Sequence, residues 1–234
     1  LKTKYMFSTK KNQGISNRRN FLKISGVGLA TTGLLLAGCD DDDNMDADDN
    51  VVMLGSGDVG ILNYAYALEQ LEAAFYATVL TGNYYDNASA DERQVLQDLA
   101  DHERAHADFF NTAINSVGTA IPELTVDFSS IDFSDRNSVL STAKTFEDLG
   151  VSAYNGAGKL ISNPDYLLVA GKIVSVEARH AAAIRDLLDS DPTSFAGDDI
   201  IDDNGLDVAR TPSEVLSMAS TFIVDEIDAS QLPS

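Results

Sequence analysis

Glutamate and histidine occur together in two short motifs of this 234-residue chain, Glu103-x-x-His106 and Glu177-x-x-His180. The chain contains only nine glutamates and three histidines, so the same pair at the same spacing is rarely repeated by chance. On a helix, residues three apart lie on one face about one turn from each other. The carboxylate and the imidazole of each motif can therefore bind the same metal ion.

A second pattern precedes each motif, a glutamate followed seven residues later by a tyrosine. Glu69 precedes Tyr76 in this way, and Glu147 precedes Tyr154. The chain thus has two related halves, each with Glu-x6-Tyr and then Glu-x-x-His, although the repeat is weak elsewhere. Glu72 is an alternative to Glu69. We favour Glu69 because its tyrosine has the same spacing as the tyrosine that follows Glu147.

Four long helices would have to position these residues. Ser89 and Glu92 form the sequence pattern of a capping box, either Asp135 or Asn137 can cap the third helix, and Pro164 suits the first position of the fourth. Together with apolar residues at helical spacing, these signals predict helices at 58–80, 90–117, 138–160 and 164–188.

The segments between and after these helices indicate how they connect. Residues 120–137 contain Pro122 and alternating apolar residues, which predicts an extended crossover, and an acidic loop at 189–207 precedes a short fifth helix at 212–227. An all-α chain with one long crossover between helices two and three has the connectivity of a ferritin-like four-helix bundle. Plain up-down packing is the alternative, and the residues on the buried faces decide between them.

These residues resemble the dinuclear site of the ferritin-like di-iron or di-manganese carboxylate proteins. The stretch 68–76, LEQLEAAFY, is similar to the first helix of the branch that includes desiccation-related proteins, and the resemblance covers residues 61–188. It implies Glu103 and Glu177 as bridging ligands, and Tyr76 and Tyr154 as hydrogen-bond partners of the carboxylates. The full ligand set that it implies is Glu69, Glu103, His106, Glu147, Glu177 and His180.

The charges of such a site would balance, because four carboxylates neutralise two divalent ions. Oxygen and imidazole ligands suit two iron ions or two manganese ions, and the sequence does not choose between them. Without metal, the clustered carboxylates would repel each other, so metal binding should stabilise the fold. His102 precedes Glu103 and points about 100° away from it on a helix, so we expect a surface histidine.

Aspartate supplies most of the acidic charge. The formal net charge is −21, and 28 of the 37 acidic residues are aspartates. A chain this acidic lacks the clustered Lys and Arg that nucleic acid or anionic lipid requires, so we expect neither as a charge-driven partner. The single cysteine, Cys39, excludes an internal disulfide framework and a zinc-finger-type site.

The first 38 residues have the layout of a signal peptide. Seven basic residues and no acidic residue precede an apolar stretch at 24–37. This stretch would span roughly 21 Å as a helix, less than the roughly 30 Å hydrocarbon core of a membrane. Arg18 and Arg19, followed by Phe-Leu-Lys, resemble a twin-arginine export signal. An ordinary secretion signal with a chance arginine pair is the alternative.

The apolar stretch leads into Cys39 through Leu-Ala-Gly, which resembles a bacterial lipobox. Cys39 would then become the lipidated first residue of the mature chain, and a plain cleavage site is the alternative. Residues 39–57 are predicted to be an acidic tether, because the seven aspartates within 40–50 repel each other and bury no apolar surface. Calcium could bind there, but no loop geometry favours it.

The sequence therefore predicts four parts: a signal peptide (1–38), a lipidated tether (39–57), a four-helix bundle (58–190), and an acidic loop with a C-terminal helix (191–234). We expect an exported, periplasmic or envelope-attached lipoprotein that uses iron or manganese on a small oxidant, oxygen or peroxide. A membrane would be contacted through the lipid only. The alternatives are a non-enzymatic envelope stress or desiccation-related protein and, less favoured, an iron-storage shell. A homodimer through the bundle faces remains open.

Overall fold

The computed structural model describes residues 51–191 and 193–234. The predictions for the signal peptide, the arginine pair and Cys39, and for most of the acidic tether, lie outside these residues. Within the described part of the chain, no helix is both long and apolar enough to cross a membrane.

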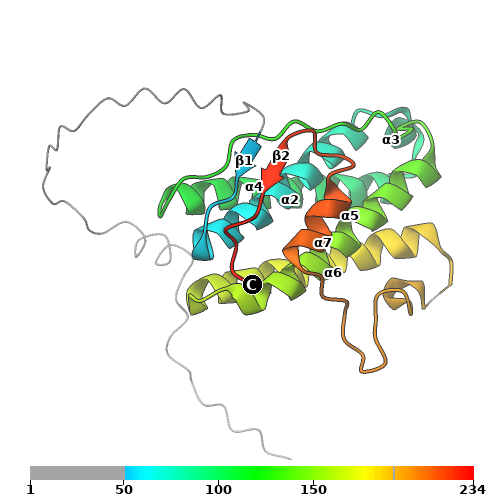
Figure 1. Cartoon of the computed structure of the whole chain (residues 1–234). Coiled ribbons are helices and arrows are strands. Elements are labelled where there is room, and N and C mark those ends of the chain that lie inside the picture. Colours follow the sequence, from blue (N-terminus) through cyan, green and yellow to red (C-terminus); the bar gives the residue numbers. More distant parts are fainter. Residues whose placement is uncertain (1–50, 192) are drawn as a thin grey trace, which may run out of the picture. The chain divides into compact units, whose positions relative to one another are not determined.

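Four long helices form the body of the described structure (Figure 1). Helix α2 packs on α4, α5 packs on α6, and contacts between α2 and α5 and between α4 and α6 close the bundle. The predicted all-α fold is confirmed, and each predicted helix end lies within three residues of the observed one. The helices are α2 (Gly57–Val79), α4 (Ala90–Asn115), α5 (Arg136–Ala157) and α6 (Pro164–Leu188).

Side-chain caps begin three of these helices at the predicted residues. The side chain of Asp135 accepts a hydrogen bond from the backbone N–H of Ser138, and that of Ser89 accepts one from Glu92. The reciprocal half of the predicted capping box is absent at Ser89, because the Glu92 carboxylate accepts a hydrogen bond from Arg136 at 2.6 Å instead. Asn163 caps α6, because its side chain accepts a hydrogen bond from the backbone N–H of Asp165, and Pro164 is the first residue of the helix. These caps fix where the ligand-bearing helices start.

The link between the two helix pairs is extended, as predicted. After α4 it runs along the bundle and forms an isolated antiparallel bridge between Val126 and Ile223. Its Phe128 and Phe133 rings lie 5.9 and 6.0 Å from the ring of Phe75 on α2. The crossover is thereby fastened to the core by aromatic contacts. A short helix that the sequence did not predict, α3 (Asn83–Asn87), connects α2 to α4.

The predicted tether is wrong at its C-terminal end. Residues Val51–Met53 form strand β1, which pairs in parallel with β2 (Glu226–Asp228) at the edge of the bundle (Figure 1). The reason is apolar burial, since Val52 and Leu54 belong to the core. Residues 51–57 therefore belong to the folded part of the chain.

The fifth helix is present but shorter than predicted. Helix α7 spans Pro212–Ala219, with the predicted capping box between Thr211 and Glu214. The chain then leaves the helix because Phe222 and Ile223 pack against the crossover and the core. The Phe222 ring lies 4.9 Å from that of Phe146 in an edge-to-face contact.

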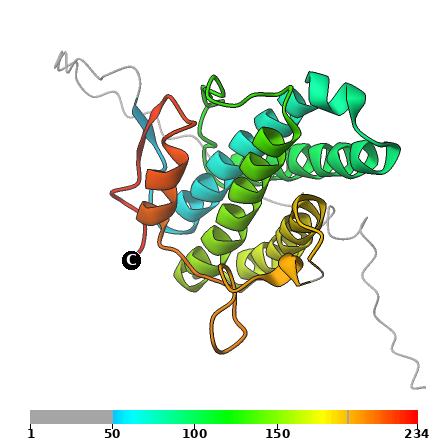
Figure 2. The ribbon, with the colours of Figure 1, turned by 90° about the vertical axis from the view of Figure 1, so that its right-hand side faces the viewer.

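The acidic segment between α6 and α7 lies along the α5 and α6 side of the bundle (Figure 2). It carries a short 3-10 helix, η2 (Ser194–Ala196). A second 3-10 helix, η1 (Gly158–Leu160), lies outside this segment and extends α5. Arg185 of α6 is buried and makes two hydrogen bonds each to Asp148 of α5 and Asp199 of this segment. This arginine therefore joins α5, α6 and the acidic segment through one network of hydrogen bonds.

Candidate metal centre

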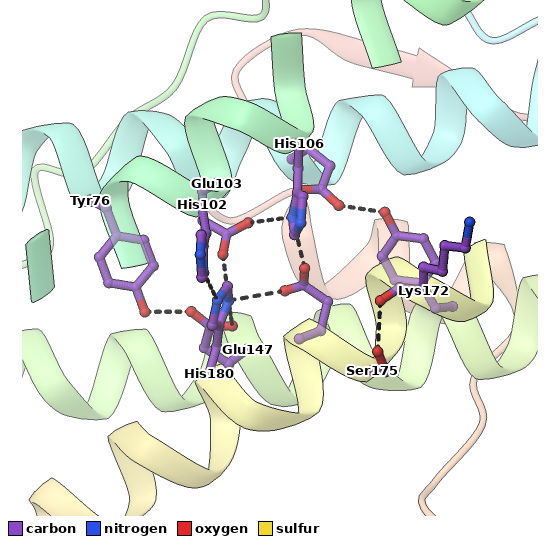
Figure 3. A network of polar contacts seen from close by, with 11 residues as sticks. Tyr76, His102, Glu103, His106, Glu147, Lys172, Ser175 and His180 are labelled. Carbon is purple, nitrogen blue, oxygen red and sulfur yellow. Dashed lines mark hydrogen bonds and ion pairs between the residues drawn. The ribbon is translucent and has the colours of Figure 1, made fainter. Parts of the chain in front are cut away.

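The four helices bring the carboxylates and histidines of the sequence motifs together in the bundle core (Figure 3). Helix α2 provides Glu69 and α5 provides Glu147, while α4 and α6 each provide one Glu-x-x-His pair. All four carboxylates have a side-chain exposure of 0%. The residues that the structure assembles are Glu69, Glu103, His106, Glu147, Glu177 and His180.

The six residues form two overlapping groups that could each hold a metal ion. Glu69 and His106 belong to the first group, and Glu147 and His180 belong to the second. Glu103 and Glu177 belong to both. Within each group the potential ligand atoms all lie within 4.8 Å of one another. This arrangement can bind two ions that share two carboxylates.

The two shared carboxylates each point one oxygen toward each histidine. For Glu103, Oε1 lies 2.6 Å from Nδ1 of His180 and Oε2 lies 3.3 Å from Nδ1 of His106. For Glu177, Oε1 lies 2.9 Å from Nδ1 of His106 and Oε2 lies 3.6 Å from Nδ1 of His180. Both side chains therefore span the two positions, as bridging ligands do.

The two remaining carboxylates are each fixed by a tyrosine from the other half of the chain (Figure 3). Tyr76 of α2 donates a hydrogen bond to Oε1 of Glu147 on α5 at 2.5 Å. Tyr154 of α5 donates one to Oε1 of Glu69 on α2. The second oxygens, Oε2 of Glu69 and Oε2 of Glu147, face His106 and His180. Each tyrosine thus leaves one oxygen of its carboxylate free to bind an ion.

Several buried polar atoms of this site have no hydrogen-bond partner. Although Nδ1 of His180 lies 2.6 Å from an oxygen of Glu103, the two atoms are not aligned as a hydrogen bond. Each such group costs about 1–3 kcal/mol if it stays unpaired. A bound cation would satisfy them together, so the residues fit a metal centre. The atoms are Oε2 of Glu69, Oε1 of Glu103, Oε2 of Glu147, both oxygens of Glu177, and Nδ1 of His180.

The electrostatics of the metal-free site show the same demand for positive charge. Burial raises the pKa of Glu69 well above its ordinary value, and it raises the pKa of Glu147 to about 8. Burial also opposes ionisation of Glu103, but the adjacent imidazoles of His106 and His180 lower the pKa of Glu103 to about 2. Burial disfavours the charged histidines, yet the surrounding carboxylates raise both histidine pKa values to about 12. Without metal, protons supply the balancing charge.

Glu72, the sequence-based alternative to Glu69, is also buried but belongs to neither group. Its carboxylate lies against Gly150 of α5. A Cβ atom added at Gly150 would lie 3.0 Å from Oε1 of Glu72. Burial, followed by repulsion from Glu177, raises the pKa of Glu72 well above its ordinary value. The structure therefore places Glu69 among the candidate ligands and Glu72 beside them, as a fifth buried acid.

His102 has a contact that the sequence analysis missed. It is exposed, as expected, but its Nδ1 lies 2.9 Å from Nε2 of His180 (Figure 3). Its spacing of four residues from His106 on one helix was the available signal, because residues four apart share a face.

A four-helix bundle whose core gathers carboxylates and histidines from all four helices defines a class of helical metal-carboxylate proteins. The comparison with known families agrees with this class. Residues 57–190 match the family described as the ferritin-like domain, which is more than half of the chain. The chain therefore belongs to the ferritin-like domain family. A search of curated proteins found no match.

Proposed function

We propose that this protein binds two iron or two manganese ions in its bundle core and uses them on a small oxidant. The observation that carries the proposal is the set of buried, unpaired oxygen and nitrogen atoms that converge from four helices. Bound iron or manganese would supply electron transfer between its +2 and +3 states. The carboxylate and imidazole donors suit either metal.

The residues of the chain would divide the work of binding. Glu103 and Glu177 would bridge the two ions, because each presents one oxygen to each histidine. Glu69 and Glu147 would bind one ion each, with their orientation set by the tyrosine hydroxyls. Four carboxylates and two divalent ions would leave no net charge in a core where all four carboxylates are fully buried.

An apolar cavity of about 30 Å³ lies beside Tyr154 and could hold a small uncharged oxidant. Tyr154, whose hydroxyl holds Glu69, forms part of its wall, together with Leu68, Phe110 and Ala153. A space of this size can hold one or two molecules as small as water. The apolar wall favours dioxygen, while hydrogen peroxide would find few polar partners in it.

The cellular setting is part of the same proposal. Arg18 and Arg19 support twin-arginine export, and Cys39 supports attachment to a membrane by a lipid. Membership of the desiccation-related branch is supported by the stretch 68–76.

Metal analysis tests the metal site directly. The full chain, exported and purified in its folded state, should contain close to two iron or manganese ions. Glu177→Gln should lose most of this metal, because it removes a ligand of both positions. Glu123→Gln, which changes an exposed glutamate on the crossover, should retain it. Wild-type protein with less than about one ion per chain after supply of either metal would refute the site.

Oxidation kinetics distinguish an oxidoreductase from a non-enzymatic protein that only binds the metal. Ferrous-loaded or manganous-loaded protein is mixed with dioxygen or with peroxide, and the metal oxidation is followed by absorbance. Turnover that Glu177→Gln abolishes would support an oxidoreductase. Stoichiometric metal without turnover by either oxidant would refute the catalytic part and favour the non-enzymatic alternative, in which the metal stabilises an envelope protein.

A further inference from the structure

The two halves of the site have matching ligands but unequal surroundings. His180 has a side-chain exposure of 4%, whereas His106 has 15%. Nε2 of His180 is 2.9 Å from Nδ1 of His102, an exposed residue of α4. Within residues 51–191 and 193–234, no side chain is found in a hydrogen bond with Nε2 of His106. In the described part of the chain, the outward nitrogen of His180 therefore has a side-chain partner, and that of His106 has none.

The contact with His102 fixes the form of His180 that can bind a metal ion. Nδ1 of His180 faces the carboxylates, 2.6 Å from Oε1 of Glu103. To bind an ion, this nitrogen must present its lone pair, so the ring proton must lie on Nε2. Nε2–H can then donate a hydrogen bond to Nδ1 of His102, which is held on the neighbouring helix. This bond selects the tautomer and restrains the rotation of the ring.

Such outer partners affect binding measurably. A ligating histidine usually donates its other ring N–H to a neighbour, and loss of that neighbour typically weakens metal binding by about 10–100-fold. A pre-oriented His180 would also lose less side-chain freedom on binding than His106, which is more exposed and has no such restraint. Both effects favour the position that contains His180.

We propose that His102 is a positioning residue for His180 and that it makes the two metal positions unequal. The position formed by Glu103, Glu147, Glu177 and His180 fills first and holds its ion more tightly. The position formed by Glu69, Glu103, His106 and Glu177 fills second and exchanges its ion more readily. This inference rests on the proposed dinuclear site, and it adds an order of filling and a residue that sets it.

Manganese titration of the metal-free full chain tests the proposal. Calorimetry should show two binding steps in the wild type, and electron paramagnetic resonance should show a mononuclear signal at one equivalent. His102→Ala should weaken the first step about 10–100-fold and leave the second nearly unchanged. His102→Asn, whose side-chain oxygen lies about where Nδ1 of the imidazole lies and can still accept the hydrogen bond, should restore most of the first step. Asp108→Ala, an exposed change on the same helix, should alter neither step.

The outcomes are distinguishable. Equal steps in the wild type, or a loss in His102→Ala that affects both steps alike or neither, would overturn the proposal. Circular dichroism of the metal-free variants shows whether they fold, and if His102→Ala does not, His102→Leu, which also lacks a hydrogen-bond acceptor, takes its place in the comparison. Absence of any metal binding by the wild type would instead refute the proposed dinuclear site itself.

Discussion

Metal loading should stabilise this protein strongly, because the same buried atoms that lack partners in the metal-free chain become ligands. An ion that binds only the folded state adds RT ln(1 + [L]/Kd), about 2.7 kcal/mol at a free concentration 100 times Kd. Two ions would add about 5 kcal/mol. A domain of 150–250 residues gains about 2–4 °C in Tm per kcal/mol, so saturating manganese should raise Tm by about 10–20 °C.

Differential scanning calorimetry measures this effect, with chelator-treated protein as the reference and magnesium as the control ion. Glu177→Gln should lose most of the shift, because both oxygens of Glu177 face the two histidines and neither has another partner. Glu123→Gln should show the full shift, since Glu123 is exposed and remote from the ligand groups.

Three results would refute this reasoning. A wild-type shift below about 3 °C at saturating manganese would mean that the unpaired atoms do not bind an ion in the folded state. A full shift in Glu177→Gln would mean that the ion binds outside the two groups. An equal response to magnesium would show that general shielding of acidic charge, and not the imidazole-containing site, produces the effect.

Three further predictions concern packing, the acidic loop and pH. Gly156→Ala should destabilise the fold by about 1–3 kcal/mol in urea unfolding, because its Cβ would lie 1.7 Å from the backbone oxygen of Arg210. Gly171→Ala, which meets nothing within 4 Å on α6, should instead stabilise it by about 0.5–1 kcal/mol. Arg185→Ala should destabilise the fold by about 1–3 kcal/mol and speed proteolysis of the segment 189–211, because Asp148 and Asp199 lose the hydrogen bonds of the guanidinium and keep Lys144 as their cationic partner. Manganese affinity should fall between pH 8 and pH 6, because a proton competes for Glu147, whose pKa burial raises to about 8.

The pH prediction has an opposite counterpart in the metal-free protein. A carboxyl group whose pKa is raised on folding stabilises the folded state most below its unfolded pKa. This contribution is lost as pH rises from about 4.5 toward about 8 for Glu147. Metal-free protein should therefore lose stability over this range as metal affinity increases. Equal affinity at pH 6 and pH 8, unchanged stability in Gly156→Ala, or unaltered proteolysis in Arg185→Ala would each contradict its prediction.

The sequence by itself determined the helices and the identity of the candidate ligands. Helical spacing and caps such as Asp135 act within a few residues, so they define helix ends without tertiary context. The spacing of Glu103 and His106 likewise places both on one face of a helix, whatever lies opposite. The twofold occurrence of this pattern selects four residues from a chain of 234, the Glu-x6-Tyr pattern adds Glu69 and Glu147, and the resemblance to ferritin-like proteins joins the six as one ligand set.

Tertiary structure decided which atoms meet. Glu69 and Glu72 share a face of α2, and only the position of that helix against α4 and α6 makes one of them a candidate ligand and the other its buried neighbour. The hydrogen bond from Tyr76 of the first half to Glu147 of the second depends on packing between the halves. The spacing of His102 and His106 places both on one face of α4, but only the packing of α4 against α6 brings His102 to His180.

The ends of the folded region show the same division. Aspartate-rich composition predicts a solvated tether, but Val51–Met53 becomes a strand because β2, far along the chain, offers unpaired backbone groups and Val52 reaches the core. Helix α7 ends earlier than predicted because Phe222 packs against the ring of Phe146 in the bundle. Local sequence sets what each segment can form alone. Pairing between distant segments decides what it forms in the folded protein, because the burial energy gained there exceeds the local preference.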